Sequence, residues 1–485
     1  MREQLRTFHL SGKGLDEFRP TSPMRPVLSE EVLKALPSGE SFQPEPLASL
    51  HAAALAAELA PARAKFLAAL KQAVAQLQDL LSVDDAKRSP PGTARISASL
   101  GAEAQRFLAV DELTGAWKRP ASPAMDDTRR GRCAASLAVL EQALAAARPE
   151  SIIFSHDGAC AEALAASHRQ LGEIVPVLRA LRVAALEALG SYDAATHDEV
   201  LARFDWQTAE PWEIAALPSI VVLETPERLA HASLTAFSIL LRSGKPVQIL
   251  VSADGLSIDD LSGSVTDIGT LALAHRGAFV LQSSVAAREH LAQGLGEMAR
   301  TLRPAVAVVS VATSKEDWLE TSLLAHSKAF PLFRYDPDRD GGWWQRFALA
   351  EPDAAFKTLT PLDALTARFA DQFRIIPGKA EKDQLELHEY FKQYKTAPPQ
   401  VIPFLNAVDA AGNPHRLAVT RELVHIGFDR LRAWEMLAAL TVAPVETQPV
   451  EPAAVVSIRE DAAKDAYKQV LAMLTDPALI SPAAR

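Results

Sequence analysis

Four short apolar runs decide the fold: SIVVL (219–223), VQILV (247–251), AFVL (278–281) and AVAVV (305–309). Each run is rich in valine and isoleucine and is apolar almost throughout, without the alternation of a half-exposed strand. A strand of this kind is buried on both faces, as in a parallel sheet that helices cover on both sides.

Helix-length segments connect these runs. Residues 226–242 separate the first two runs, and residues 285–302 separate the last two and have a helical period. Strand, helix and strand in succession predict an α/β fold with a mostly parallel, doubly wound sheet.

The flanking sequence divides the chain of 485 residues into four parts. We expect an extended, proline-rich arm (1–48), a helical region (49–150), the α/β core (151–352) and a mainly helical C-terminal region with one hairpin (353–485). An arm of this composition wraps a neighbouring domain or subunit, or stays disordered.

Three local elements are expected within these parts. Leu47–Leu81 reads as a long helical stretch, either continuous or as two helices joined at Ala60-Pro61. A helix is expected at Thr360–Phe373. Residues 401–419 predict a hairpin, because Ala411-Gly412-Asn413 supplies turn residues between two apolar runs.

Composition excludes several classes of protein. The formal net charge of −10 argues against a nucleic-acid partner held by a broad basic face. The densest basic run, Arg129-Arg130-Gly131-Arg132, is a local patch or a solvated helix start. The two cysteines, Cys133 and Cys160, cannot form a disulfide framework, a four-cysteine zinc site or a four-cysteine iron–sulfur cluster.

The sequence favours a soluble cytoplasmic protein. The N-terminal residues lack the hydrophobic core of a signal peptide. The most apolar helical stretch, Ile174–Leu189, is interrupted by Arg179 and Arg182 and is too short to span a bilayer. Two unpaired thiols also suit a reducing compartment.

Candidate site residues follow the predicted strands. Asp254 and Asp259 come after the run at 247–251, where an α/β sheet binds ligands. They are candidate Mg²⁺ ligands or, as we favour, turn formers. His156 and Cys160 form a candidate imidazole–thiol pair, although a buried cysteine is the commoner role.

The segment Phe330-Pro331-Leu332-Phe333-Arg334-Tyr335-Asp336-Pro337 carries a family resemblance. It resembles the end of the thiamine-diphosphate domain of pyruvate:ferredoxin oxidoreductases and related 2-oxoacid oxidoreductases. There, the last strand leads through a helix to a Leu-Tyr-Arg-Tyr-Asp/Asn-Pro-like segment. The order of strands and helices from 218 to 337 is similar as well. The resemblance implies a thiamine-diphosphate-domain-like fold.

The chain departs from this family where the cofactor binds. The family's Gly-Asp-Gly, whose aspartate binds Mg²⁺, corresponds to Leu223-Glu224-Thr225. The family's Tyr-Ser-Asn-Thr-Gly-Gly corresponds to residues 257–262, with Asp259 near the asparagine position. Without glycine, the backbone cannot approach a diphosphate closely. The family's cysteine-rich cluster motifs are also absent.

Two main functional hypotheses follow from the resemblance. In the first, the chain is a pseudoenzyme without cofactor or catalytic residues, a structural or regulatory component that assembles with the redox subunits of an electron-transfer complex, or with itself. In the second, it is a thiamine-diphosphate-dependent 2-oxoacid oxidoreductase subunit, in which Glu224 and Asp259 hold Mg²⁺ and Asp254 is a further cofactor-site candidate. A plain α/β ligand-binding protein is the third option. Trp343-Trp344 is either an exposed partner patch or a packed lid.

Overall fold

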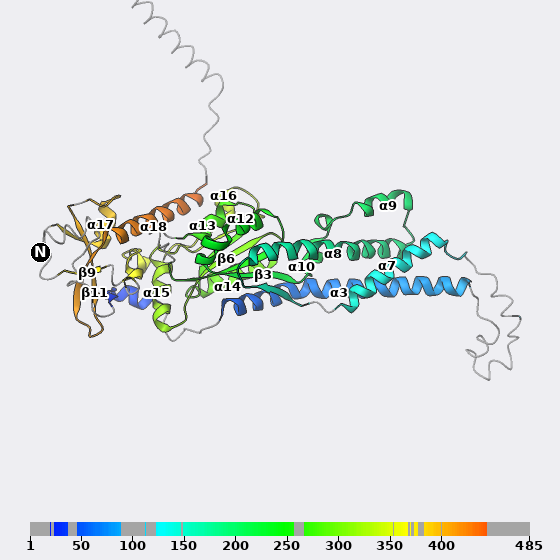
Figure 1. Cartoon of the computed structure of the whole chain (residues 1–485), viewed down its shortest axis with the longest axis horizontal. Coiled ribbons are helices and arrows are strands. Elements are labelled where there is room, and N and C mark those ends of the chain that lie inside the picture. The colour runs from blue at the N-terminus through cyan, green and yellow to red at the C-terminus, as the bar shows by residue number, and fades with distance from the viewer. Residues whose placement is uncertain are drawn as a thin grey trace, which may run out of the picture. The chain divides into compact units, whose positions relative to one another are not determined.

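The structure is a computed structural model that describes residues 20, 24–36, 46–88, 112, 123–146, 149–256, 266–352, 354–366, 369, 373–376, 383–398 and 400–443 (Figure 1). The chain divides into two compact units, Met1–Thr441 and Val442–Arg485. All the helices and strands named below belong to the first unit. The division into four parts from the sequence stays a prediction.

A seven-stranded sheet forms the centre of the first unit, in the order β2-β3-β4-β6-β5-β7-β8. Strands β2 to β6 pair in parallel, whereas β7 and β8 are antiparallel. The mixed α/β fold with a mostly parallel sheet is therefore confirmed. The strands are β2 (Ser151–Phe154), β3 (Ser219–Glu224), β4 (Val247–Asp254), β5 (Phe279–Ser284), β6 (Ala305–Val311), β7 (Phe333–Tyr335) and β8 (Phe347–Leu349).

Alternate residues of the central strands face two different layers of helices. Val222 and Val251 pack in one core cluster, and Val221 and Phe279 pack in another on the opposite face. The first face is covered by the start of α8 (Ala159–Ala188) and by α12 (Leu234–Arg242), α13 (Ile268–Ala274) and α15 (Lys315–His326). The second is covered by α3 (Leu47–Arg88) and α14 (Arg288–Arg300).

Helix α3 continues beyond the sheet and packs with α7 (Asp127–Ala145) and α8. Leu77, Leu140 and Leu178, one from each helix, are fully buried where the three helices meet. Helix α3 runs through Pro61 as one helix, so the break at Ala60-Pro61 is not observed. Proline removes a single backbone donor, and packing on both sides of it holds the helix together. In the described part of the chain, no helix combines the length and apolarity needed to cross a bilayer.

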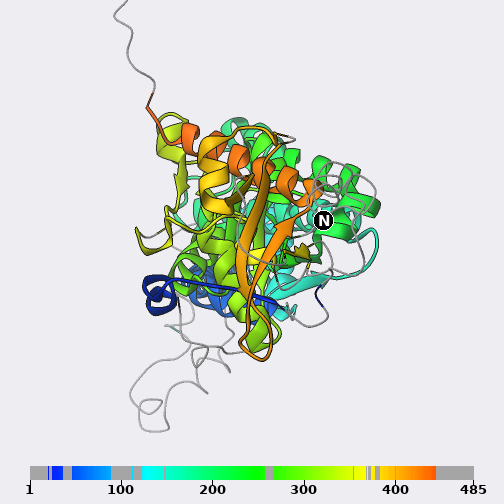
Figure 2. The ribbon, with the colours of Figure 1, turned by 90° about the vertical axis from the view of Figure 1, so that its left-hand side faces the viewer.

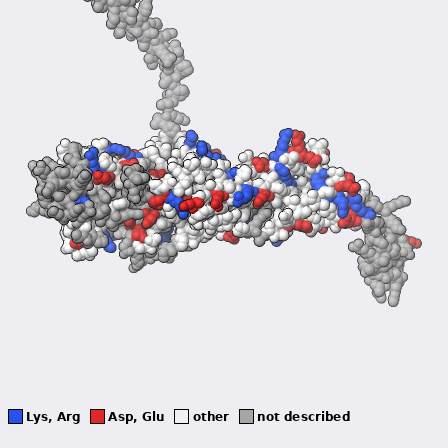
Figure 3. All heavy atoms as spheres, viewed as in Figure 1, with Lys and Arg blue, Asp and Glu red and all other residues white. Residues whose placement is uncertain are grey.

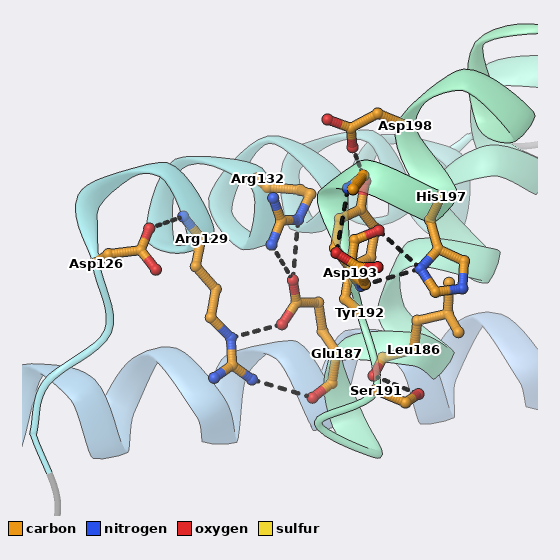
Figure 4. A network of polar contacts seen from close by, with 11 residues as sticks. Asp126, Arg129, Arg132, Leu186, Glu187, Ser191, Tyr192, Asp193, His197 and Asp198 are labelled. Atoms are coloured by element: carbon orange, nitrogen blue, oxygen red, sulfur yellow. Dashed lines mark hydrogen bonds and ion pairs between the residues drawn. The ribbon is translucent and has the colours of Figure 1, made fainter.

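The basic run at the start of α7 pairs with buried carboxylates. Arg129 and Arg132 each donate a 2.6 Å hydrogen bond to the Glu187 carboxylate at the end of α8 (Figure 4). Arg130 donates one of 2.7 Å to Asp84 on α3. Both carboxylates are 1% exposed. The run therefore ties the three helices together and is not a free basic patch.

On the face in Figure 3, acidic and basic side chains are interspersed over the described surface.

A second, five-stranded sheet contains the predicted hairpin (Figure 2). Strands β11 and β12 pair antiparallel, and the turn between them has Gly412 at φ 83°. The helix expected at Thr360–Phe373 is largely wrong: the described residues there contain one 3₁₀ turn, Asp363–Leu365, and Phe373 begins a strand. The strands are β1 (Arg25–Pro26), β9 (Phe373–Ile375), β10 (Gln384–Glu386), β11 (Ile402–Val408) and β12 (Pro414–Val419), flanked by α17 (Leu387–Gln393) and α18 (Arg421–Leu440).

The described part of the N-terminal arm docks on this second sheet. Strand β1 pairs antiparallel with β11, and the Val27 N–H donates a 2.9 Å hydrogen bond to the Asn406 carbonyl. Helix α2 (Glu30–Ala35) follows with Ser29 as its N-cap and buries Val32.

The remaining short elements are α9 (Ala194–Ala202), α10 (Pro211–Ala215), α11 (Pro226–Arg228), α16 (Trp343–Arg346), a π-helical turn (Leu229–Ser233) and 3₁₀ turns at Trp206–Thr208 and Ala354–Phe356.

An Asp84→Asn variant tests whether the ionised Asp84 carboxylate on α3 stabilises the fold through its arginine partners. Burial raises the pKa of Asp84, but hydrogen bonds from Arg88, the Met125 N–H and Arg130 outweigh it and lower the pKa from 3.8 to about 2. The ionised form therefore stabilises the fold above about pH 4, and this contribution is lost as the pH falls toward 2. Urea titrations at about pH 2.5, 4 and 7 should show a shallower acid loss of unfolding free energy in the variant.

The matched control is Asp79→Asn, because Asp79 lies exposed on the same helix. In this control, the unfolding free energy should depend on pH as it does in the wild type. An Asp84→Asn variant with the same dependence as the wild type would show that Asp84 is not held in its ionised form.

Candidate functional site

The candidate site is built from the loops that leave the carboxyl edge of the parallel strands, because α/β sheets bind ligands there. The loop after β3 carries the first cofactor-site candidate, Glu224, and the loop after β4 carries Asp254 and Asp259. The loop after β2 carries His156 and leads to Cys160 on α8.

Glu224 is the last residue of β3 and is buried, with no exposed side-chain surface. Its carboxylate accepts a hydrogen bond from Nε of Arg228, and Arg228 Nη2 donates a 2.6 Å bond to the Leu223 carbonyl. Thr225 is the N-cap of the following turn and accepts the Arg228 N–H through its hydroxyl, at 3.3 Å. A threonine cap followed by Pro226 starts this turn and brings Arg228 back over the strand end.

The second oxygen of Glu224 is buried and lacks a hydrogen-bond partner among the described residues. Cys160 lies close enough to respond to this charge: burial and then Glu224 raise the pKa of its thiol to about 12. Cys160 is fully buried, whereas His156 is exposed and pairs with Glu162 at 3.1 Å. The candidate imidazole–thiol pair is therefore not formed, and a protonated Cys160 is no nucleophile near neutral pH.

The structure does not bring Asp254 to Glu224. Glu224 is the register partner of Val251, so Asp254 lies three residues, about 10 Å, farther along the next strand. Asp254 is exposed at the end of β4, whereas Glu224 is buried. Asp259 lies outside the described residues. Among the residues described, no three His, Cys, Asp or Glu side chains come together in a group that could hold a metal ion.

The described residues do not fit a magnesium diphosphate. Mg²⁺ takes six oxygen ligands, and at Glu224 one of the two carboxylate oxygens is already bonded to a guanidinium. A divalent cation beside Arg228 would meet like charge. Leu223 and Thr225 also place side chains where a close backbone approach to phosphate needs glycine.

A cavity of about 430 Å³ lies near the ends of β5 and β6. These neighbouring strands lead to α14 and α15, which cover opposite faces of the sheet. The sequence offered no signal for it, because α3 supplies one wall from more than 200 residues away in the chain. The cavity is lined by Leu50, Ala54, Glu58, Val285, Arg288, Leu291, Ala292, Leu295, Gly296 and Trp318, so it offers room for an apolar group.

The segment that carries the family resemblance has a structural role. Its strand β7 pairs antiparallel with β5, and the buried Tyr335 donates a 2.9 Å hydrogen bond to the Arg276 carbonyl. Trp343 stacks on Tyr335 with ring centroids 4.8 Å apart, and Trp344 remains 37% exposed. Of the tryptophan pair, one residue is therefore a packed lid and the other contributes to the surface.

Comparisons with known proteins give little support for a family. No protein-family model matches the chain, and no curated protein matches it. Among solved structures, the chain is weakly similar to a candidate thiamin diphosphate-dependent enzyme from Mycobacterium smegmatis, at 12% identity and a TM-score of 0.18. The match covers 42% of this chain and 38% of that one. A likeness this low carries no argument about activity or cofactor.

Substituting Arg228 tests whether its guanidinium neutralises Glu224. Arg228→Met leaves the carboxylate buried and unpaired, so it should lower the free energy of unfolding by about 3 kcal/mol. Adding Glu224→Gln should recover at least half of this loss, because a neutral amide has a smaller desolvation cost. Urea titrations of the two single variants and the double variant measure the coupling.

The control is Arg203→Met, which breaks an exposed pair with Glu199, also four residues apart. This variant should change the unfolding free energy by less than about 0.5 kcal/mol. A loss in Arg228→Met no larger than in the control would mean that the two groups are not coupled.

Proposed function

We propose that the chain is a non-catalytic structural or regulatory component related to 2-oxoacid:ferredoxin oxidoreductases, which assembles with redox partner subunits. The observation that carries the proposal is the pairing of Arg228 with buried Glu224. In the family that the sequence resembles, the residue at this position binds the Mg²⁺ of the cofactor. Here an internal cation takes the place of that ion.

The ion pair opposes cofactor binding energetically. A Mg²⁺ ion would have to displace Arg228 from Glu224 and from the Leu223 carbonyl. The displaced guanidinium would then lie close to the incoming dication, in a region where Glu224 is buried and screening by water is weak. A diphosphate would also meet side chains at residues 223 and 225, where the family has glycine.

Assembly explains why such a scaffold is kept. A thiamine-type domain of this family pairs with a second one, because the cofactor lies across their interface. The outer surfaces of α12 and α13 carry large exposed apolar residues: Leu234, Ile239 and Leu271 are 41%, 46% and 38% exposed. Large apolar side chains exposed on helices that cover one face of the sheet suit a protein partner better than solvent.

The alternative is a thiamine-diphosphate-dependent subunit that binds Mg²⁺ through Glu224 and Asp259. The observation in its favour is the second oxygen of Glu224, which is buried without a hydrogen-bond partner among the described residues. Such an oxygen is expensive to leave unsatisfied and would accept a metal or a donor if Arg228 moved aside.

Thermal unfolding with thiamine diphosphate and MgCl₂ separates the two functions. A ligand that binds only the native state raises the free energy of unfolding by RT ln(1 + [L]/Kd), and Tm rises with it. We expect no rise in Tm for the wild-type protein at millimolar ligand, and no retention of thiamine diphosphate in equilibrium dialysis.

Glu224→Gln is the matched variant for this test, because it removes the charge and keeps the shape of the side chain. Stoichiometric binding to the wild type that disappears in Glu224→Gln would overturn the proposal and establish the alternative. Unchanged Tm in both proteins supports the non-catalytic role.

A further inference from the structure

We propose that a basic, aromatic cleft beside the second sheet binds a small anion that carries a planar ring, of the class of a nucleoside diphosphate. The cleft has a volume of about 220 Å³ and lies among the end of α15, the segment 357–361, α17 and α18. Its lining residues are Lys328, Lys357, Leu359, Thr360, Pro361, His388, Phe391, Lys392, Tyr394, Lys395, Phe428, Leu431, Arg432, Trp434 and Glu435.

The charge of the lining selects an anion. Four lysines and Arg432 line the cleft with one carboxylate, Glu435, in a chain whose formal net charge is −10. Two of the lysines have carboxylate partners on the exposed surface: Lys395 pairs with Glu435 at 3.0 Å, and Lys392 pairs with Glu389 at 3.5 Å. Among the described residues, no carboxylate pairs with Lys328 or Lys357. Clustered cations of this kind attract phosphate groups and bind them through charge-assisted hydrogen bonds.

Lys328 is held in a strained backbone conformation. It follows the C-cap of α15 and has φ 65°, in the left-handed region where helices usually end on glycine. A residue with a side chain costs about 1 kcal/mol there relative to glycine. The lysine places its Nζ 5.5 Å from the centroid of the Trp434 ring. Strain of this kind collects at ligand-binding positions, where the side chain is needed.

The floor and walls of the cleft are aromatic. Phe391 and Phe428 pack edge to face with centroids 4.9 Å apart, and a Cβ on Gly427 would approach Phe391 to 2.4 Å. Glycine at 427 therefore lets the floor close tightly. Trp434 and Tyr394 are half-buried on the lining, so their rings remain partly accessible for stacking.

The volume of the cleft limits what it can hold. Ligand pockets usually measure roughly 300–1,000 Å³, and this cleft is smaller. A planar ring fits against the aromatic walls, and its phosphates then extend over the exposed end of Lys357. Thiamine diphosphate suits the cleft less well, since its ring carries a positive charge that the cations repel.

Titration calorimetry with ADP, without divalent metal, tests this proposal. We expect ADP to bind with one site per chain, more weakly as salt is raised. Adenosine supplies the ring without the phosphates, and pyrophosphate supplies the phosphates without the ring. Each should bind at least about tenfold more weakly than ADP. Failure of millimolar ADP to bind would overturn the proposal. Pyrophosphate that binds as tightly as ADP would also contradict it, because the ring would then contribute nothing to the affinity.

Lys328→Gly is the decisive variant, because glycine relieves the left-handed backbone while it removes the ammonium group. Binding of ADP should weaken about tenfold while Tm stays unchanged or rises. Lys71→Gln, on the exposed side of α3, is the matched control and should bind ADP like the wild type. Equal affinity in Lys328→Gly and the wild type would contradict the assignment.

The test is independent of the proposed function. Glu224→Gln should leave ADP binding unchanged, because Glu224 does not line the cleft. Binding of ADP that Glu224→Gln abolishes and Lys328→Gly preserves would place the nucleotide at the carboxyl edge of the large sheet and would contradict this inference.

Discussion

Burial of the parallel strands on both faces is the constraint on which the rest of the structure depends. Strands β3 to β6 present Val222 and Val251 to one helical layer and Val221 and Phe279 to the other. Neither set can be left in water, so α12 and α13 must cover one face and α3 and α14 the other. Because α3 also extends beyond the sheet, the same constraint positions α7 and α8 against it. Arg129 and Arg132 of α7 then bond to Glu187 of α8.

The chemistry at the carboxyl edge follows from how each strand ends. Strand β3 ends in a buried carboxylate, and burying an unpaired charge is so costly that a partner within reach becomes structurally necessary. Arg228 fills that role from the next turn, at a spacing of four residues. A carboxylate neutralised by its own chain has little capacity for a metal ion. The same local geometry that makes the strand end stable therefore argues against a magnesium ion at Glu224.

The main strands could be predicted from the sequence because their signal is local. The runs at 219–223, 247–251, 278–281 and 305–309 correspond to β3, β4, β5 and β6, and the hairpin near Gly412 corresponds to β11 and β12. The pairing of Glu224 with Arg228 has no regular helical signal, because Glu224 ends strand β3. The turn that Thr225 and Pro226 start brings Arg228 back over the strand end.

Other features depend on contacts that no local pattern contains. Residues 360–373 have helix-like spacing, yet the pairing of β9 with β12 draws Phe373 into a strand. Helix α3 passes through Pro61 because the sheet and the helical region hold it on either side. The cleft at Lys328 assembles residues from four separate segments, so no local pattern of the sequence contains it.

Native mass spectrometry of the protein purified from its own cells tests the central claim most directly, because it reports bound subunits and bound cofactor together. The proposed non-catalytic role predicts a complex that contains this chain and a different partner chain, with no added mass of thiamine diphosphate. A chain that carries one equivalent of thiamine diphosphate with magnesium, with or without a partner, would contradict it.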